Sequence, residues 1–200
     1  LYRWRGAGLR LTMRAWTLGR LSFDAAGENT LDLALPDGPL AARLRAATAQ
    51  AELWQAADGG HLDARLADLA VAADRSDYEL SLGRLDLSAL QRKKAAGYSL
   101  RLSANGLHLS EQLDLPLGSE FARFELDAEA TGAVDPAGPR AGGLAAWRDA
   151  GGKLVIKRLV IEWGPLALTA EGTLALDQQM RPQGLLTARI LGLSETIAQL

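Results

Sequence analysis

The chain has 200 residues, with 22 Lys and Arg against 24 Asp and Glu, a formal net charge of −2, and no cysteine. This near-neutral balance disfavours nucleic acid as a partner, and the lack of cysteine excludes disulfides, thiolate metal sites and cysteine nucleophiles. The length suits one β-rich domain over residues 1–200. No apolar run approaches the roughly eighteen residues of a membrane-spanning helix. The first residues lack both a methionine start and a signal-peptide core, so we expect a piece of a longer protein.

Alternating apolar and polar residues predict a mainly β protein, an antiparallel meander of about ten strands. The strands are expected at 9–23, 30–35, 40–53, 62–71, 78–87, 98–109, 121–131, 153–163, 166–176 and 184–190. Turn residues separate most of them, as at Asp58-Gly59-Gly60. The segment 40–54 would also suit a helix, because it is rich in alanine and arginine.

Two or three short helices are expected to interrupt the meander. Ser88 can cap a helix that runs to Lys94, a second helix is predicted at 144–150, and Ser194 can begin a third. The second helix carries Trp147. This side chain either packs in the core, the commoner role of a large aromatic, or lies over the apolar face like the edge of a lid.

One spacing recurs five times: two apolar residues in alternation, a two-residue insert, and two more apolar residues in alternation. It occurs at 16–23, 64–71, 80–87, 102–109 and 154–161. Both halves share one face only if the strand bulges or bends at the insert. Inserts such as Gly83-Arg84 and Asn105-Gly106 contain glycine, which accepts the backbone angles of a bulge. The pattern therefore predicts a curved, bulged sheet that is apolar on one side.

The apolar side is expected to be lined mainly by leucine, which supplies about one residue in five. The lining residues are Leu80, Leu82, Leu100, Leu102, Leu107, Leu109, Phe124, Leu126, Leu154, Ile156, Leu166, Leu168, Leu174 and Leu176. Such a face must be covered. The expected helices are too few for this, so the sheet either folds over as a closed sandwich or leaves an open groove for an apolar ligand.

The C-terminal quarter carries a family resemblance. The turn Trp163-Gly164-Pro165, the segment from Gly172 and the strand from Gly184 resemble the domain of unknown function 2125 family of alphaproteobacteria. That resemblance implies an envelope protein with an N-terminal membrane anchor, and it assigns no activity. The bulged repeat is more loosely similar to AsmA-like proteins, which implies a long β groove connected with lipid transport or outer-membrane maintenance.

Catalytic and metal-binding patterns are not found in the sequence. His61 and His108 lie far apart, without ligand-like spacing around either. The alternating acids Glu125, Asp127 and Glu129 could serve acid-base chemistry, but a solvated outward face is the simpler explanation. The basic run 91–94 could contact anionic lipid head groups or could simply end a soluble helix.

These observations lead to two functional expectations. The first is a non-enzymatic periplasmic domain, anchored to the inner membrane by a segment outside this chain, whose leucine-lined groove binds lipid or acyl chains. The second is a structural module with a closed core that pairs through its edge strands. No cofactor, metal or nucleic acid is expected, and the oligomeric state stays open.

Overall fold

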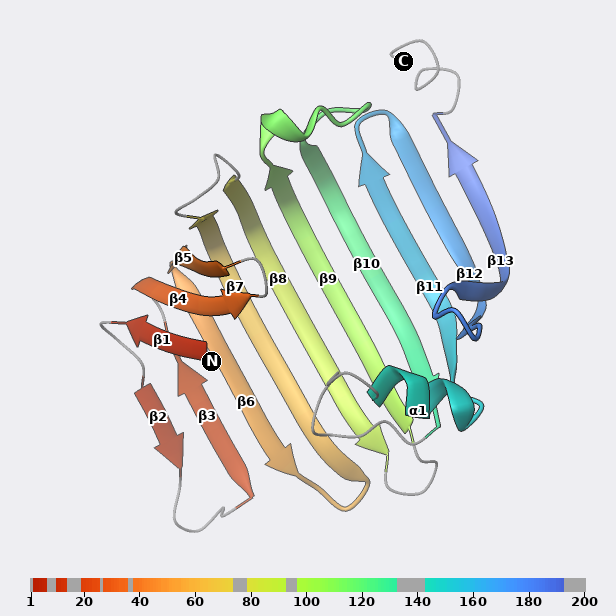
Figure 1. Cartoon of the computed structure of the whole chain (residues 1–200), viewed down its shortest axis with the longest axis horizontal. Helices are drawn as coiled ribbons and strands as arrows, with labels where there is room; N and C mark the ends of the chain where they lie inside the picture. The colour runs from red at the N-terminus through yellow and green to blue at the C-terminus, as the bar shows by residue number, and fades with distance from the viewer. Residues whose placement is uncertain are drawn as a thin grey trace.

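The computed structural model describes residues 2–6, 10–13, 19–25, 27–35, 38–73, 79–92, 97–132 and 143–192. These residues form thirteen strands in one antiparallel sheet, one α-helix and one 3-10 turn (Figure 1). The elements are β1 (Tyr2–Gly6), β2 (Arg10–Met13), β3 (Arg20–Asp24), β4 (Gly27–Leu35), β5 (Gly38–Ala46), β6 (Thr48–Gln55), β7 (Gly59–Ala73), β8 (Glu79–Arg92), β9 (Gly97–Leu109), η1 (Glu111–Leu113), β10 (Glu120–Thr131), α1 (Gly143–Asp149), β11 (Lys153–Trp163), β12 (Leu166–Leu176) and β13 (Pro182–Leu191).

From β7 onward, every strand pairs with the next strand along the chain, which gives the expected antiparallel meander (Figure 1). At the N-terminal side of the sheet, two strands, β5 and β6, pair with different parts of β7. Residues 60–67 of β7 pair with β6, whereas residues 70–73 pair with β5. Asp68 lies between these two ladders with a φ of +49°, a backbone conformation that non-glycine residues seldom adopt.

Most expected strands have a counterpart in the sheet, and the differences lie in the N-terminal half. The segment 40–53 forms two strands, β5 and β6, because the chain bends at Ala47, a residue that gives no turn signal in the sequence. Likewise 9–23 holds β2 and β3, and β1 was not anticipated. The prediction of about ten strands therefore becomes thirteen.

The expectation of two or three helices is wrong. Ser88 continues β8, where it lies opposite Asp63 of β7 and Arg101 of β9. Pairing on both sides outweighs the local capping preference of a single serine. The described residues hold only the seven-residue α1 and the turn η1, and neither has the length and apolar character needed to cross a membrane. The third expected helix, from Ser194, lies outside the described residues.

Bulges keep the apolar residues on one face. In the β10–β11 ladder, Phe121 lies opposite Trp163 and Phe124 opposite Ile161, so Ala122 is an extra residue in β10. Trp163 and Ile161 share a face because they are two residues apart in β11. Phe121 and Phe124 therefore share that face too. The same register continues through β9, β8 and β7, so both halves of the repeated pattern face the same way.

The sheet is open and does not fold over as a sandwich within the described residues. All thirteen strands belong to the same sheet. The accessible surface of 13337 Å² exceeds the value of about 9,100 Å² for a compact monomer of this mass. The buried hydrophobic residues are few: Ala46, Leu82, Ala104, Ala128, Trp147, Ile156 and Val160. Stability must therefore come from the long ladders and from partial burial of apolar side chains.

Candidate functional site

The strands from β7 to β13 align their apolar residues in rows that run across the sheet, here called rungs. One central rung contains Leu66, Leu85, Ala104, Phe124, Ile161, Leu168 and Ile190. The next contains Ala64, Leu87, Leu102, Leu126, Leu159, Ala170 and Ala188. A third contains Leu62, Ala89, Leu100, Ala128, Ile156, Gly172 and Leu186. Together with the residues in line with them along each strand, these rungs form the apolar face.

All fourteen residues predicted to line the apolar side lie on this face. They are Leu80, Leu82, Leu100, Leu102, Leu107, Leu109, Phe124, Leu126, Leu154, Ile156, Leu166, Leu168, Leu174 and Leu176. The prediction omitted other residues of the same rungs, including Leu85, Leu87, Leu159 and Ile161. Their alternation within the repeated pattern was the signal that could have added them.

The apolar face is only partly buried. Of the fourteen residues, Leu82 and Ile156 are buried, with 7% and 6% of their surface exposed, and the other twelve are partly exposed. Leucines in a closed core are usually fully buried. Each partly exposed side chain retains apolar area whose removal from water is favourable by about 25 cal/mol per Å². Binding of an apolar partner to this face would therefore be favourable.

The residues of the family motif shape the C-terminal part of the face. Trp163 ends β11, and its Nε1 donates a hydrogen bond of 2.7 Å to the Gly118 carbonyl oxygen. Gly164 begins the turn into β12 with a φ of +54°, and Pro165 completes that turn. This turn holds the Trp163 indole at one end of the rungs.

Gly172 and Gly184 allow β12 and β13 to pair closely. A Cβ on Gly172 would lie 2.1 Å from the Leu185 carbonyl oxygen, and one on Gly184 would lie 2.0 Å from that of Thr173. Any side chain would collide with the backbone of the neighbouring strand. These two motif glycines are therefore structural requirements of the β12–β13 ladder.

Trp147 packs against strand ends. Its Nε1 donates a hydrogen bond of 2.7 Å to the Thr131 carbonyl oxygen at the end of β10, and its ring fills the space beside Gly152, where an added Cβ would lie 2.3 Å from the indole. These contacts hold α1 near the end of β10 and the beginning of β11 (Figure 1). These contacts favour the packing interpretation of Trp147 over a lid edge.

The opposite face, here called the polar face, carries a lattice of ion pairs. One of its rungs contains Asp63, Ser88, Arg101, Asp127 and Arg158. Arg101 lies 3.3 Å from Asp127, and Arg158 lies 3.5 Å from Glu125. Glu125 also pairs with Arg123 on its own strand, and Glu129 pairs with Arg92 and Lys157. All three acids of the alternating triplet therefore have cationic partners.

The charges around these carboxyl groups oppose a role in proton transfer. The hydrogen bond from Arg123 lowers the pKa of Glu125, and the hydrogen bond from Lys157 lowers the pKa of Glu129. A general acid or base that works near neutral pH needs a carboxyl pKa shifted in the opposite direction. The sequence showed the acids, but not their cross-strand partners, because partner choice depends on register.

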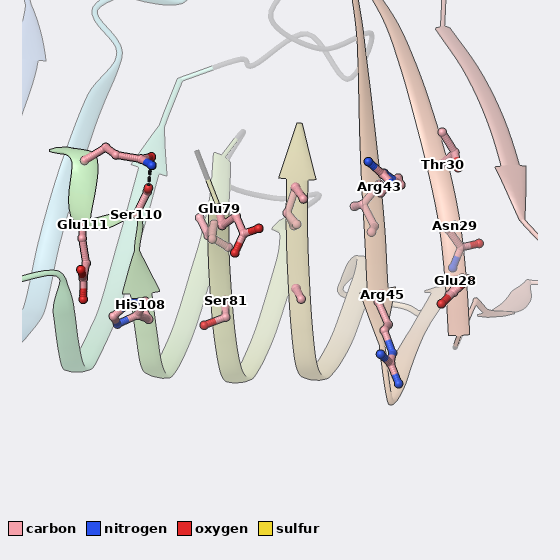
Figure 2. A pocket seen from close by; sticks show the side chains of 16 residues that line it. Glu28, Asn29, Thr30, Arg43, Arg45, Glu79, Ser81, His108, Ser110 and Glu111 are labelled. Atoms are coloured by element: carbon pink, nitrogen blue, oxygen red, sulfur yellow. Dashed lines mark hydrogen bonds between the residues drawn. The ribbon is translucent and has the colours of Figure 1, made fainter. Parts of the chain in front are cut away.

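Three hollows of the described structure lie on the polar face. The largest, of about 860 Å³, spans β4, β5, β7, β8 and the segment after β9 (Figure 2). Glu28, Arg45, Ser81 and His108 lie on one polar rung within it. The other two, of about 380 and 330 Å³, share Asp63 and Arg65. In place of the expected leucine-lined groove, the described residues form a broad apolar face that no other described strand covers, and the three hollows lie on the opposite side of the sheet.

Neither histidine lies in a metal-binding arrangement. His61 Nε2 lies 2.9 Å from Asp58 Oδ1, and this contact lowers the pKa of Asp58. The His61 ring stacks on Trp54 with centroids 4.8 Å apart. His108 Nδ1 lies 3.4 Å from Ser119 Oγ. Among the described residues, no group of three His, Asp or Glu side chains could hold a metal ion.

Comparison with known proteins assigns a family. A family model described as "Uncharacterized protein conserved in bacteria (DUF2125)" matches residues 2–200, so the chain belongs to that family. The resemblance of the last quarter of the sequence to the domain of unknown function 2125 family is confirmed, and the match extends over nearly the whole chain. No curated protein and no solved structure matches.

Proposed function

Starting from this membership, which brings no known activity, we propose that the protein is a non-enzymatic domain whose apolar face binds acyl chains of lipids. The observation that carries the proposal is the continuity of the apolar rungs over seven strands, together with the partial exposure of their leucines. A soluble protein seldom leaves so continuous an apolar surface uncovered without a partner.

The dimensions of the face suit linear alkyl chains. Adjacent rungs are two residues apart, about 6.8 Å along the strands, and strands lie about 4.8 Å apart. An alkyl chain that lies between two rungs can therefore cross several strands and contact leucines on both sides. Each methylene group removed from water contributes about 0.8 kcal/mol, so binding strength should rise with chain length.

The cellular setting is part of the same proposal. We place the domain in the periplasm of a Gram-negative bacterium, held at the inner membrane by a segment outside this chain, where it takes part in lipid handling or envelope maintenance. The support is the loose resemblance of the bulged repeat to AsmA-like envelope proteins, together with the open, leucine-rich sheet. Further copies of the bulged repeat would extend the same face.

Two tryptophans on opposite faces provide the test. Trp163 lies on the apolar face, whereas Trp54 pairs with His61 on the polar face. Single-tryptophan variants that retain one or the other, with the remaining tryptophans changed to phenylalanine, are titrated with brominated fatty acids, which quench indole fluorescence on contact. We expect quenching of Trp163 at concentrations that leave Trp54 bright. Equal quenching of both, or of neither, contradicts the proposal.

A second candidate, a structural module that pairs through its edge strands, is favoured by one observation. β13 has a neighbour, β12, on one side within the described residues, and every residue of β13 is exposed. Hydrogen exchange of the β13 amides tests this candidate. Slow exchange at the outward-facing amides means that another strand pairs there, and fast exchange means that the edge is free.

A further inference from the structure

β13 is apolar on both of its faces. Leu186 and Ile190 belong to the apolar face, and 43% and 45% of their surface is exposed. Leu185 and Leu191 lie on the opposite side of the strand and are 78% and 62% exposed. These four are half of the eight large hydrophobic residues exposed in the described part of the chain.

The edge of β13 lacks the features that usually block an edge strand. Exposed edges are commonly protected by charged side chains, proline or bulges. β13 has proline only at its first residue, Pro182, and a single charged residue, Arg189, and its ladder with β12 is regular throughout. The middle of the strand is therefore able to accept another strand.

We propose that the partner at this edge is a second copy of the chain, with the two β13 strands antiparallel about a two-fold axis at Ala188. A two-fold axis perpendicular to the sheet places the apolar faces of both copies on the same side. Residues of the two strands that lie opposite each other must therefore point to the same side of the sheet. With the axis at Ala188, Leu186 opposes Ile190 of the second copy, and Leu185 opposes Leu191. Every exposed large apolar residue of β13 then has an apolar partner.

Neighbouring registers are less complementary. With the axis at Thr187, Leu185 would oppose Arg189 of the second copy. With the axis at Arg189, the two arginines would oppose each other, and directly opposed like charges destabilise a strand pair. In the Ala188 register, Arg189 opposes Thr187 instead. Residue chemistry therefore selects one of the three registers.

The proposed dimer is a specific form of the second candidate function, pairing through edge strands, and it does not depend on lipid binding. It names the partner and the register of the pair. It would also place the apolar faces of the two copies side by side on one continuous sheet, because the axis preserves facing. A closed two-fold contact uses both β13 edges and stops there, so it leads to dimers and not to fibres.

The absence of cysteine makes a register-specific test possible. In the Ala188→Cys variant, the two introduced thiols would belong to directly opposed residues with Cα atoms about 4.5–5.5 Å apart, within disulfide range. The Thr187→Cys variant is the matched control. Its two Cα atoms would be diagonal neighbours about 7–8 Å apart, too far for an unstrained bridge. Both sites are exposed positions in the middle of β13.

We expect the wild-type chain to sediment as a concentration-dependent dimer, and oxidised Ala188→Cys to form disulfide dimers several-fold more efficiently than Thr187→Cys. A wild type that is monomeric at every concentration would overturn the inference. So would equal or greater crosslinking of Thr187→Cys. If the β13 amides are protected in a strictly monomeric protein, the edge is paired but not with a second copy, so the inference fails while the edge-pairing candidate stands.

Discussion

Phe121 and Trp163 stack across β10 and β11, with ring centroids 4.8 Å apart and ring planes 14° apart. Ala122, the extra residue of a bulge, follows Phe121 directly. The aromatic pair therefore lies where the alternation of apolar and polar residues in β10 shifts by one position, and it joins the two halves of the apolar face there. The hydrogen bond from Trp163 to the Gly118 carbonyl oxygen then connects the pair to the loop before β10.

Replacement of Trp163 should separate these two contributions. Trp163→Phe keeps the stack and loses the hydrogen bond, so we expect the free energy of unfolding to fall by about 1 kcal/mol. Trp163→Ala also loses the aromatic pair, worth about 0.5–1.5 kcal/mol beyond area burial, and should cost clearly more. Urea denaturation measures both values. Equal losses in the two variants would mean that the stack contributes nothing.

The glycine pair of the β12–β13 ladder gives a steric prediction. Gly172→Ala must displace the backbone of β13, so we expect a loss of about 3 kcal/mol or more. Gly151→Ala is the control, since Gly151 has a φ of +74° but no atom within 4 Å of an added Cβ, which limits its cost to about 1–2 kcal/mol of backbone strain. If thermal or chemical unfolding gives the same loss for both, the close approach of the strands is not limiting.

Leucine truncations report on the openness of the apolar face. Leu82 is 7% exposed, so Leu82→Ala should cost about 3 kcal/mol, within the range of core substitutions. Leu126 is only partly buried, and Leu126→Ala should cost about half as much because less apolar area returns to water. Chemical denaturation of the lipid-free protein provides the comparison. A loss for Leu126→Ala as large as that for Leu82→Ala would indicate that the face is covered.

The ion-pair lattice predicts a pH dependence with a definite sign. The pKa values of Glu125 and Glu129 are lowered in the folded protein by Arg123 and Lys157, so their contribution to stability is complete above the ordinary glutamate pKa of about 4.3. It is lost as the pH falls through the lowered values. Both Lys157→Met and Glu129→Gln should reduce the fall in the free energy of unfolding at acid pH. If the fall in the free energy of unfolding at acid pH is the same in both variants as in the wild type, the ion pairs of Glu129 do not contribute to stability as proposed.

Much of the fold follows from alternation, and the failures have identifiable physical causes. Leu80, Leu82, Leu85 and Leu87 were enough to predict a strand over the first part of β8 and its apolar side, because the side of the sheet on which a residue lies is a local property of the strand. The division at Ala47 was missed because alanine gives no turn signal. Ser88 was expected to start a helix because a cap is local, whereas pairing with two neighbouring strands is not.

The candidate site divides in the same way. Its apolar residues could be predicted because they repeat at fixed spacing, but its openness could not, since a closed sandwich and an open sheet have the same alternation. The partners of Glu129 depend on which strands are neighbours and in what register. The exposure of Leu185 and Leu191 depends on β13 being the last strand of the described sheet, and alternation within one strand contains no such information.

Native mass spectrometry with organic extraction, on protein purified from a Gram-negative periplasm, shows whether the apolar face binds lipid. We expect phospholipid or fatty acid at near-stoichiometric amounts. Replacement of Leu102 and Leu126 on the apolar face by glutamine should reduce this amount strongly, whereas replacement of Arg101 and Asp127 on the polar face by the same residue should not. A stable protein that carries no lipid under these conditions, and takes up none when phospholipid vesicles are added, would contradict lipid binding by this face.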